Sequence, residues 1–129
     1  MHRVGRLDGG RPLGDRAAAD AWRRTGALLV AALQVGLGDG SVTMAVAYAG
    51  QRRQFGREIG SFQAIKHLLA DAYAGVEVAR AAVWSAAVQL DEALAEGDVA
   101  LVDRAIAGAR VVAASASVTA AKTCIQVHG

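Results

Sequence analysis

Apolar residues recur every three or four positions along most of this chain, which is the spacing of one face of an α-helix. Ser61 is a candidate N-cap and Gly97 a candidate C-cap for a helix that ends at about Glu96. Between them lies one continuous apolar stripe, which predicts a buried helix face: Phe62, Ile65, Leu69, Ala72, Val76, Ala79, Val83, Ala86 and Leu90.

A first helix is predicted before this one, from Asp15 or Ala17 to about Arg53, with Asp15 as a possible N-cap. Its middle contains three glycines, Gly36, Gly38 and Gly40. Each costs a free helix about 0.5–1 kcal/mol relative to alanine. Their clustering therefore predicts a place where another helix packs closely.

A third helix is predicted from about Val99 to Val127, with Asp98 as its N-cap and Gly129 as the glycine that follows its last turn. Two helices of about 30–36 residues would each be about 45–54 Å long, so links this short require antiparallel packing.

We expect an all-α fold, with three long antiparallel helices of an up-and-down bundle. Residues 16–129 form an incomplete helical-bundle domain, and residues 1–15 form an irregular lead-in that resembles the remnant of a preceding domain. The open fourth side should expose an apolar strip, which predicts self-association, partner binding or poor solubility.

Composition supports the helical interpretation, because the residues are 53% hydrophobic but only 5% aromatic and alanine fills the difference. The net charge is +2, without the sustained basic stripe and stacking aromatics of a nucleic-acid interface. Residues 25–51 contain one charged side chain, Asp39, near the middle of the apolar stretch. A helix buried in protein accounts for this stretch better than a membrane span.

Other candidate chemistry is sparse. Cys124 is the single cysteine and is expected to be a small core residue near a helix end, which is consistent with a cytoplasmic location. His67 has no histidine or acidic partner at a clear ligand spacing, so no metal site is predicted.

The most informative stretch is residues 48–63, a basic, glycine-broken turn between two apolar helices. It carries Arg52, Arg53 and Arg57 around Phe55. A guanidinium offers two parallel donors to a phosphate, which favours an anionic ligand. The alternative is that these arginines are solvated and only decorate a helix end.

The order Tyr48, Arg52, Phe55-Gly56 and Phe62-Gln63 resembles the junction that opens the C-terminal helical domain of flavin-dependent acyl-CoA dehydrogenases. The last four residues, Gln126-Val127-His128-Gly129, resemble the start of that family's second flavin-contacting segment. The resemblance covers roughly residues 15–129.

The resemblance implies a site for FAD that is shared with a neighbouring subunit of a homo- or hetero-oligomer. In the family, the residue matched by Arg52 reaches the FAD pyrophosphate. Gln54 matches a polar flavin contact, Phe55 an aromatic beside the cofactor, and Gln63 the glutamine on the next helix. The terminal motif adds four further contacts: Gln126, Val127, His128 and Gly129.

The family dehydrogenates an acyl-CoA thioester with a glutamate that takes the α proton while flavin N5 receives the β hydride. Residues 1–57 contain no glutamate, and the position that holds the base in a minority of members is Gly26 here. In most members the base lies beyond the position of Gly129. We therefore assign no catalytic residue and expect a fragment or degenerate subunit that supplies FAD contacts and subunit packing. The alternative is a stand-alone helical interaction module without flavin.

Overall fold

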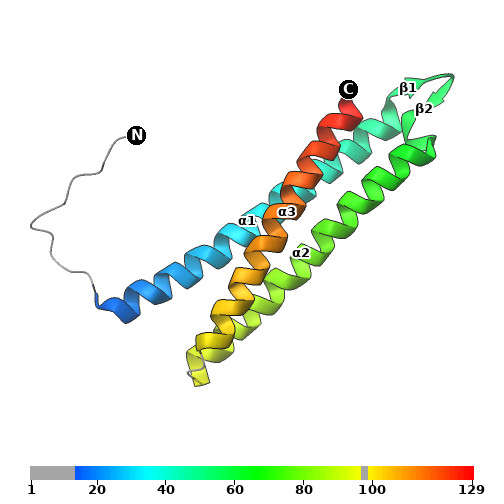
Figure 1. Cartoon of the computed structure of the whole chain (residues 1–129). Coiled ribbons are helices and arrows are strands. Elements are labelled where there is room, and N and C mark those ends of the chain that lie inside the picture. Colours follow the sequence, from blue (N-terminus) through cyan, green and yellow to red (C-terminus); the bar gives the residue numbers. More distant parts are fainter. Residues whose placement is uncertain (1–13, 97–98) are drawn as a thin grey trace, which may run out of the picture.

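The structure, a computed structural model, describes residues 14–96 and 99–129. The expectations for residues 1–13 and for the caps Gly97 and Asp98 lie outside the described residues. Figure 1 shows three long helices that run alongside one another, with a small hairpin between the first two. The elements are α1 (Arg16–Gln51), β1 (Arg53–Gln54), β2 (Arg57–Glu58), a 3-10 turn (Ile59–Ser61), α2 (Gln63–Glu96) and α3 (Val99–His128).

The predicted ends of the first and third helices are largely confirmed. Asp15 caps α1, because its Oδ1 accepts a hydrogen bond from the N–H of Ala18 at 2.9 Å. The helix ends at Gln51, two residues before the predicted boundary, because Arg52 adopts an extended backbone. At the end of α3, Gly129 has a φ of 122° and its N–H donates to the carbonyl of Ile125 at 3.2 Å, as expected of a terminating glycine.

The predicted start of the second helix is wrong by two residues. The hydroxyl of Ser61 donates to the carbonyl of Glu58 at 2.6 Å, within the 3-10 turn, and α2 starts two residues later. The helix begins at Gln63, and the carbonyl of Phe62 accepts from the N–H of Lys66 at 3.1 Å. The predicted apolar stripe is confirmed, since all nine of its residues are buried or half-buried.

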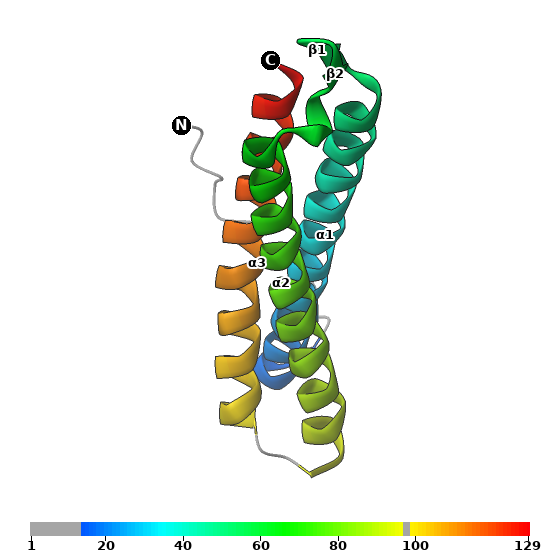
Figure 2. The same cartoon turned by 90° about the vertical axis from the view of Figure 1, so that its right-hand side faces the viewer.

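The core is made mostly of alanine and valine, and α3 packs against both other helices (Figure 2). Its central cluster takes residues from all three helices: Ala31, Val35 and Val42 of α1, Ala72, Val76 and Ala79 of α2, and Ala113 and Ala120 of α3. Such small side chains allow the helix axes to approach closely. The all-α class is confirmed, with the hairpin as the small addition.

One of the three glycines in α1 lies at a close helix contact. A Cβ on Gly38 would lie 3.0 Å from Cγ2 of Val76 and 3.4 Å from Cα of Ser117, so α2 and α3 both meet α1 there. The prediction is wrong for Gly36 and Gly40, which are exposed and would have no atom within 4 Å of an added Cβ.

The outer face of α1 is apolar. It exposes Trp22, Leu29, Leu33, Leu37 and Met44, whose spacing places them along one side of the helix. We call these five residues the α1 stripe. They agree with the predicted apolar strip.

Among the described residues, α1 is the one helix long and apolar enough to cross a membrane by length and composition. Its single mid-helix charge, Asp39, accepts a hydrogen bond from Arg80 of α2 at 2.9 Å. A hydrogen bond to Glu77, with support from Asp39, raises the pKa of Arg80 above its ordinary value. The hydrogen bond between Arg80 and Asp39 links α2 to α1.

Candidate functional site

The basic turn is a two-stranded β-hairpin. Strands β1 and β2 pair antiparallel, with Arg53 opposite Glu58 and Gln54 opposite Arg57. The two turn residues, Phe55 and Gly56, have φ values of 52° and 79°. Two consecutive positive φ values are the pattern of a type I′ turn, which matches the twist of a hairpin. Gly56 adopts this conformation without steric cost, whereas Phe55 does not.

Two aromatic rings hold the hairpin over the start of α2. Phe55, which is 88% exposed, lies edge-on to Phe62 with ring centroids 6.2 Å apart. Cζ of Arg57 lies 4.0 Å from the centroid of the Phe62 ring, a cation–π distance. Arg57 is therefore engaged with the aromatic ring that directly precedes α2.

Backbone contacts fix the base of the hairpin against α1. The N–H of Ile59 donates to the carbonyl of Arg52 at 2.8 Å, and the N–H of Arg52 donates to Tyr48 at 2.9 Å. A Cβ on Gly60 would lie 3.0 Å from the carbonyl oxygen of Ala49, so the chain passes directly over the last turns of α1. The position of Arg52 is thus set by the backbone.

The end of α3 meets the end of α1 beside the hairpin. The imidazole of His128 stacks on the ring of Tyr48, and its Nδ1 donates to the carbonyl of Cys124 at 2.7 Å. Cys124 is half-buried and packs against the small cluster formed by Ala45, Ala49 and Val127, near the helix end where it was expected.

A cavity of about 380 Å³ lies between the hairpin and the end of α3; we call it the hairpin cavity. It is lined by Tyr48, Arg52, Gln54, Phe55, Ile59, Phe62, Ile65, Val127, His128 and Gly129. Six residues predicted from two distant motifs therefore lie around one space. The other two, Gln63 and Gln126, are exposed and do not line it.

Four lining residues were absent from the predicted site, namely Tyr48, Ile59, Phe62 and Ile65. Tyr48 and Phe62 belong to the quoted sequence motif, so the motif could have indicated them. Ile59 and Ile65 carry no polar side-chain group. Ile65 was predicted only as part of the buried apolar stripe, and Ile59 was not singled out. They supply an apolar wall behind the polar rim.

The lining combines one guanidinium and one amide with aromatic and aliphatic side chains, and it contains no aspartate or glutamate side chain. Arg52 and Gln54 can bind an oxyanion, and the rings of Phe55 and Phe62 can cover a planar apolar group. A volume of about 380 Å³ is at the lower end for small-molecule sites, so the cavity suits part of a dinucleotide. No group of three or more potential metal ligands occurs in the part of the chain that the structure describes.

The sequence matches the family described as acyl-CoA dehydrogenase, C-terminal domain, over residues 21–129. The chain belongs to the acyl-CoA dehydrogenase family. It carries that family's C-terminal domain, as the motifs around Arg52 and His128 predicted.

Several bacterial proteins are similar to this chain. It is 42% identical over 105 residues to acyl-CoA dehydrogenase IpdE2 of Mycobacterium tuberculosis, a match covering 81% of the chain and 30% of the relative. It is 41% identical over 103 residues to FadE34 of the same organism, covering 80% and 14%. It is 36% identical over 107 residues to 3-sulfinopropanoyl-CoA desulfinase of Paraburkholderia xenovorans, covering 83% and 25%.

A solved structure described as an electron transferring flavoprotein of Acidaminococcus fermentans has the same arrangement. The TM-score is 0.73 at 32% identity, covering 82% of this chain and 26% of the other. The chain thus spans less than a third of each of these relatives. The sequence relatives align with it over this domain, and the solved structure shares its helical packing.

Proposed function

We propose that the hairpin cavity binds part of an FAD molecule, with the rest of the cofactor held by another acyl-CoA dehydrogenase subunit. One observation carries this proposal: six residues that the two flavin motifs single out line the same cavity, namely Arg52, Gln54, Phe55, Val127, His128 and Gly129.

Each wall of the cavity suits a different part of the cofactor. Arg52 would hold the pyrophosphate, because a planar guanidinium can donate two parallel hydrogen bonds to a phosphate. Gln54 adds an amide donor at the rim. Phe55 and the stacked pair Tyr48–His128 offer ring surfaces to the planar portion of the ligand. When bound, FAD supplies the acceptor for a hydride.

The chain's own contribution is binding rather than proton transfer. The lining contains no aspartate or glutamate side chain that could remove an α proton, and the resemblance places the base of some family members at about Gly26. We infer that a complete enzyme obtains its base and its acyl-CoA pocket from other segments. The reaction of such an enzyme would be α,β-dehydrogenation of a thioester.

The α1 stripe supports a second role in subunit packing. Its five large apolar side chains lie on one side of one helix, where exposure to water is unfavourable. We infer that another acyl-CoA dehydrogenase subunit or domain covers it, in a homo- or hetero-oligomer. Self-association without flavin binding would instead favour the stand-alone interaction module.

The test is FAD binding by the purified chain, alone and mixed with a full-length family member, followed by flavin fluorescence anisotropy. Arg52→Ala should weaken binding at least about tenfold, because a charge-assisted pair is lost. Arg53→Ala is the matched control, since the neighbouring arginine is equally exposed but does not line the cavity. An equal loss of FAD affinity in the two variants would refute the proposal. Absence of FAD binding both by the chain alone and by the mixture would refute it as well.

A further inference from the structure

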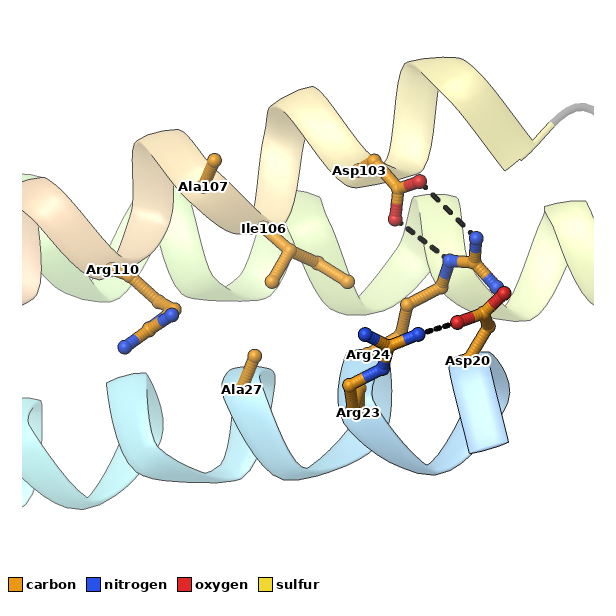
Figure 3. A pocket seen from close by; sticks show the side chains of 8 residues that line it. All are labelled: Asp20, Arg23, Arg24, Ala27, Asp103, Ile106, Ala107 and Arg110. Carbon is orange, nitrogen blue, oxygen red and sulfur yellow. Dashed lines mark hydrogen bonds and ion pairs between the residues drawn. The ribbon is translucent and has the colours of Figure 1, made fainter. Parts of the chain in front are cut away.

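A second charged cavity lies at the opposite end of the bundle from the hairpin, between the first turns of α1 and the first turns of α3. Its volume is about 430 Å³. Five of its lining residues are charged, three arginines and two aspartates: Arg23, Arg24, Arg110, Asp20 and Asp103. Figure 3 shows them on the facing sides of the two helices. We call this space the arginine cavity.

The two aspartates each occupy one arginine. Nε of Arg24 donates to Oδ1 of Asp103 at 2.7 Å, and Nη2 of Arg24 donates to Oδ2 at 3.1 Å, so the pair is bidentate. Arg23 pairs with Asp20, one turn earlier on the same helix. Both carboxylates of the cavity are therefore already engaged.

Arg110 is different, because it has no hydrogen-bond or ion-pair partner among the residues that the structure describes. Three guanidinium groups against two carboxylates leave the cavity with one uncompensated positive charge. That charge attracts an anion from outside the domain.

The floor of the arginine cavity is apolar. It consists of Ala27 on α1 and of Ile106 and Ala107 on α3, and Ile106 is only 4% exposed. The two alanines leave the space open where longer side chains would fill it. An apolar stem attached to an anionic group can rest on this floor while the charged end reaches Arg110.

We propose that the arginine cavity is a binding site for one oxyanion on a short apolar stem, a carboxylate or a phosphate ester, bound by Arg110 and attracted by Arg23 and Arg24. The anionic group offsets the excess positive charge left by three arginines and two aspartates, and the site is independent of the flavin. Its source is either a free organic acid or an acidic side chain of a neighbouring protein segment.

The site is tested by titrating the full chain with pentanoate and following the backbone amides of Ala27 and Ala107 by NMR, at constant ionic strength set with chloride. We expect saturable shifts at these two amides. Arg110→Ala should weaken pentanoate binding at least about tenfold. Arg104→Ala is the matched control, since this arginine is also exposed on α3 but does not line the cavity, and it should change the affinity less than about twofold.

Two further ligands identify the source. If inorganic phosphate binds more tightly than pentanoate, the ligand is a phosphate. If a short apolar peptide with one glutamate binds more tightly than pentanoate, and the same peptide with glutamine does not bind, the ligand is a protein carboxylate. Equal weakening by Arg110→Ala and Arg104→Ala would show only a general attraction of anions and would overturn the proposal. Absence of saturable shifts with all three ligands would overturn it as well.

Discussion

The imidazole of His128 is stacked on the ring of Tyr48, with centroids 4.1 Å apart and planes inclined by 26°. This contact joins the last turn of α3 to the end of α1, although the two residues are far apart in the sequence. It therefore forms one wall of the hairpin cavity and also holds the chain terminus in place.

Replacing Tyr48 by alanine should loosen the end of α3. Loss of the stacked pair should lower the free energy of unfolding by about 0.5–1.5 kcal/mol, in addition to the loss from reduced burial. Amide exchange should accelerate most at residues 126–128, because the rest of α3 keeps its core contacts. Tyr48→Phe keeps the ring and is the control. Equal exchange rates in the two variants would show that the stack contributes nothing.

Replacing Phe55 should change the stability of the hairpin and the binding of FAD in opposite directions. Its positive φ costs an ordinary side chain roughly 1–2 kcal/mol, a cost that asparagine largely avoids. Phe55→Asn should therefore strengthen the hairpin, measured by cross-strand nuclear Overhauser effects between β1 and β2. The same variant should weaken FAD binding, because a ring is removed from the cavity wall. A variant that strengthened both properties would contradict the role given to Phe55.

Gly38 and Gly40 should respond oppositely to larger side chains. Gly38→Val places atoms against buried Val76 and the backbone of Ser117, and overpacking of this kind costs about 1–3 kcal/mol. Gly40→Ala meets no neighbour and should stabilise the protein by about 0.5–1 kcal/mol. Urea unfolding of the two variants measures both effects. Stabilisation by both substitutions would contradict the close helix contact at Gly38.

The Arg24–Asp103 pair predicts a pH dependence. Hydrogen bonds from Arg24 lower the pKa of Asp103 below its ordinary value, so this contribution to stability is present at neutral pH. It is lost as the pH falls below about 4 and through the depressed pKa, because the protonated acid no longer pairs. Wild type should exceed Asp103→Asn in stability at pH 7, and the gap should narrow in acid. A gap that widens on acidification would contradict this assignment.

The sequence predicted most of the fold because the helices are long and their apolar spacing is regular. The prediction of a close helix contact holds at Gly38 and fails at the other two glycines for a geometric reason. Residues two apart on a helix point about 200° apart, so Gly36 and Gly40 share one face and Gly38 lies on the other. Only the face of Gly38 meets other helices.

The hairpin could not be predicted from periodicity, because each of its strands has two residues. Ser61 has the residue type of a helix N-cap, but in the structure its hydroxyl donates to the carbonyl of Glu58 in the 3-10 turn. For the site, the family motifs identified the correct neighbourhood, but a motif does not say which side of a helix faces the cavity. Gln63 and Gln126 are exposed outside it for that reason.

The two walls of the hairpin cavity come from residues 48–65 and 127–129, which are connected through the whole of α2 and α3. A ligand held between them would close a long loop of the chain through non-covalent contacts. At a free concentration of one hundred times Kd, it would stabilise the folded state by about 2.7 kcal/mol. The contacts between the ligand and one of the two walls must break before the end of α3 can separate from α1. Bound ligand should therefore also slow unfolding.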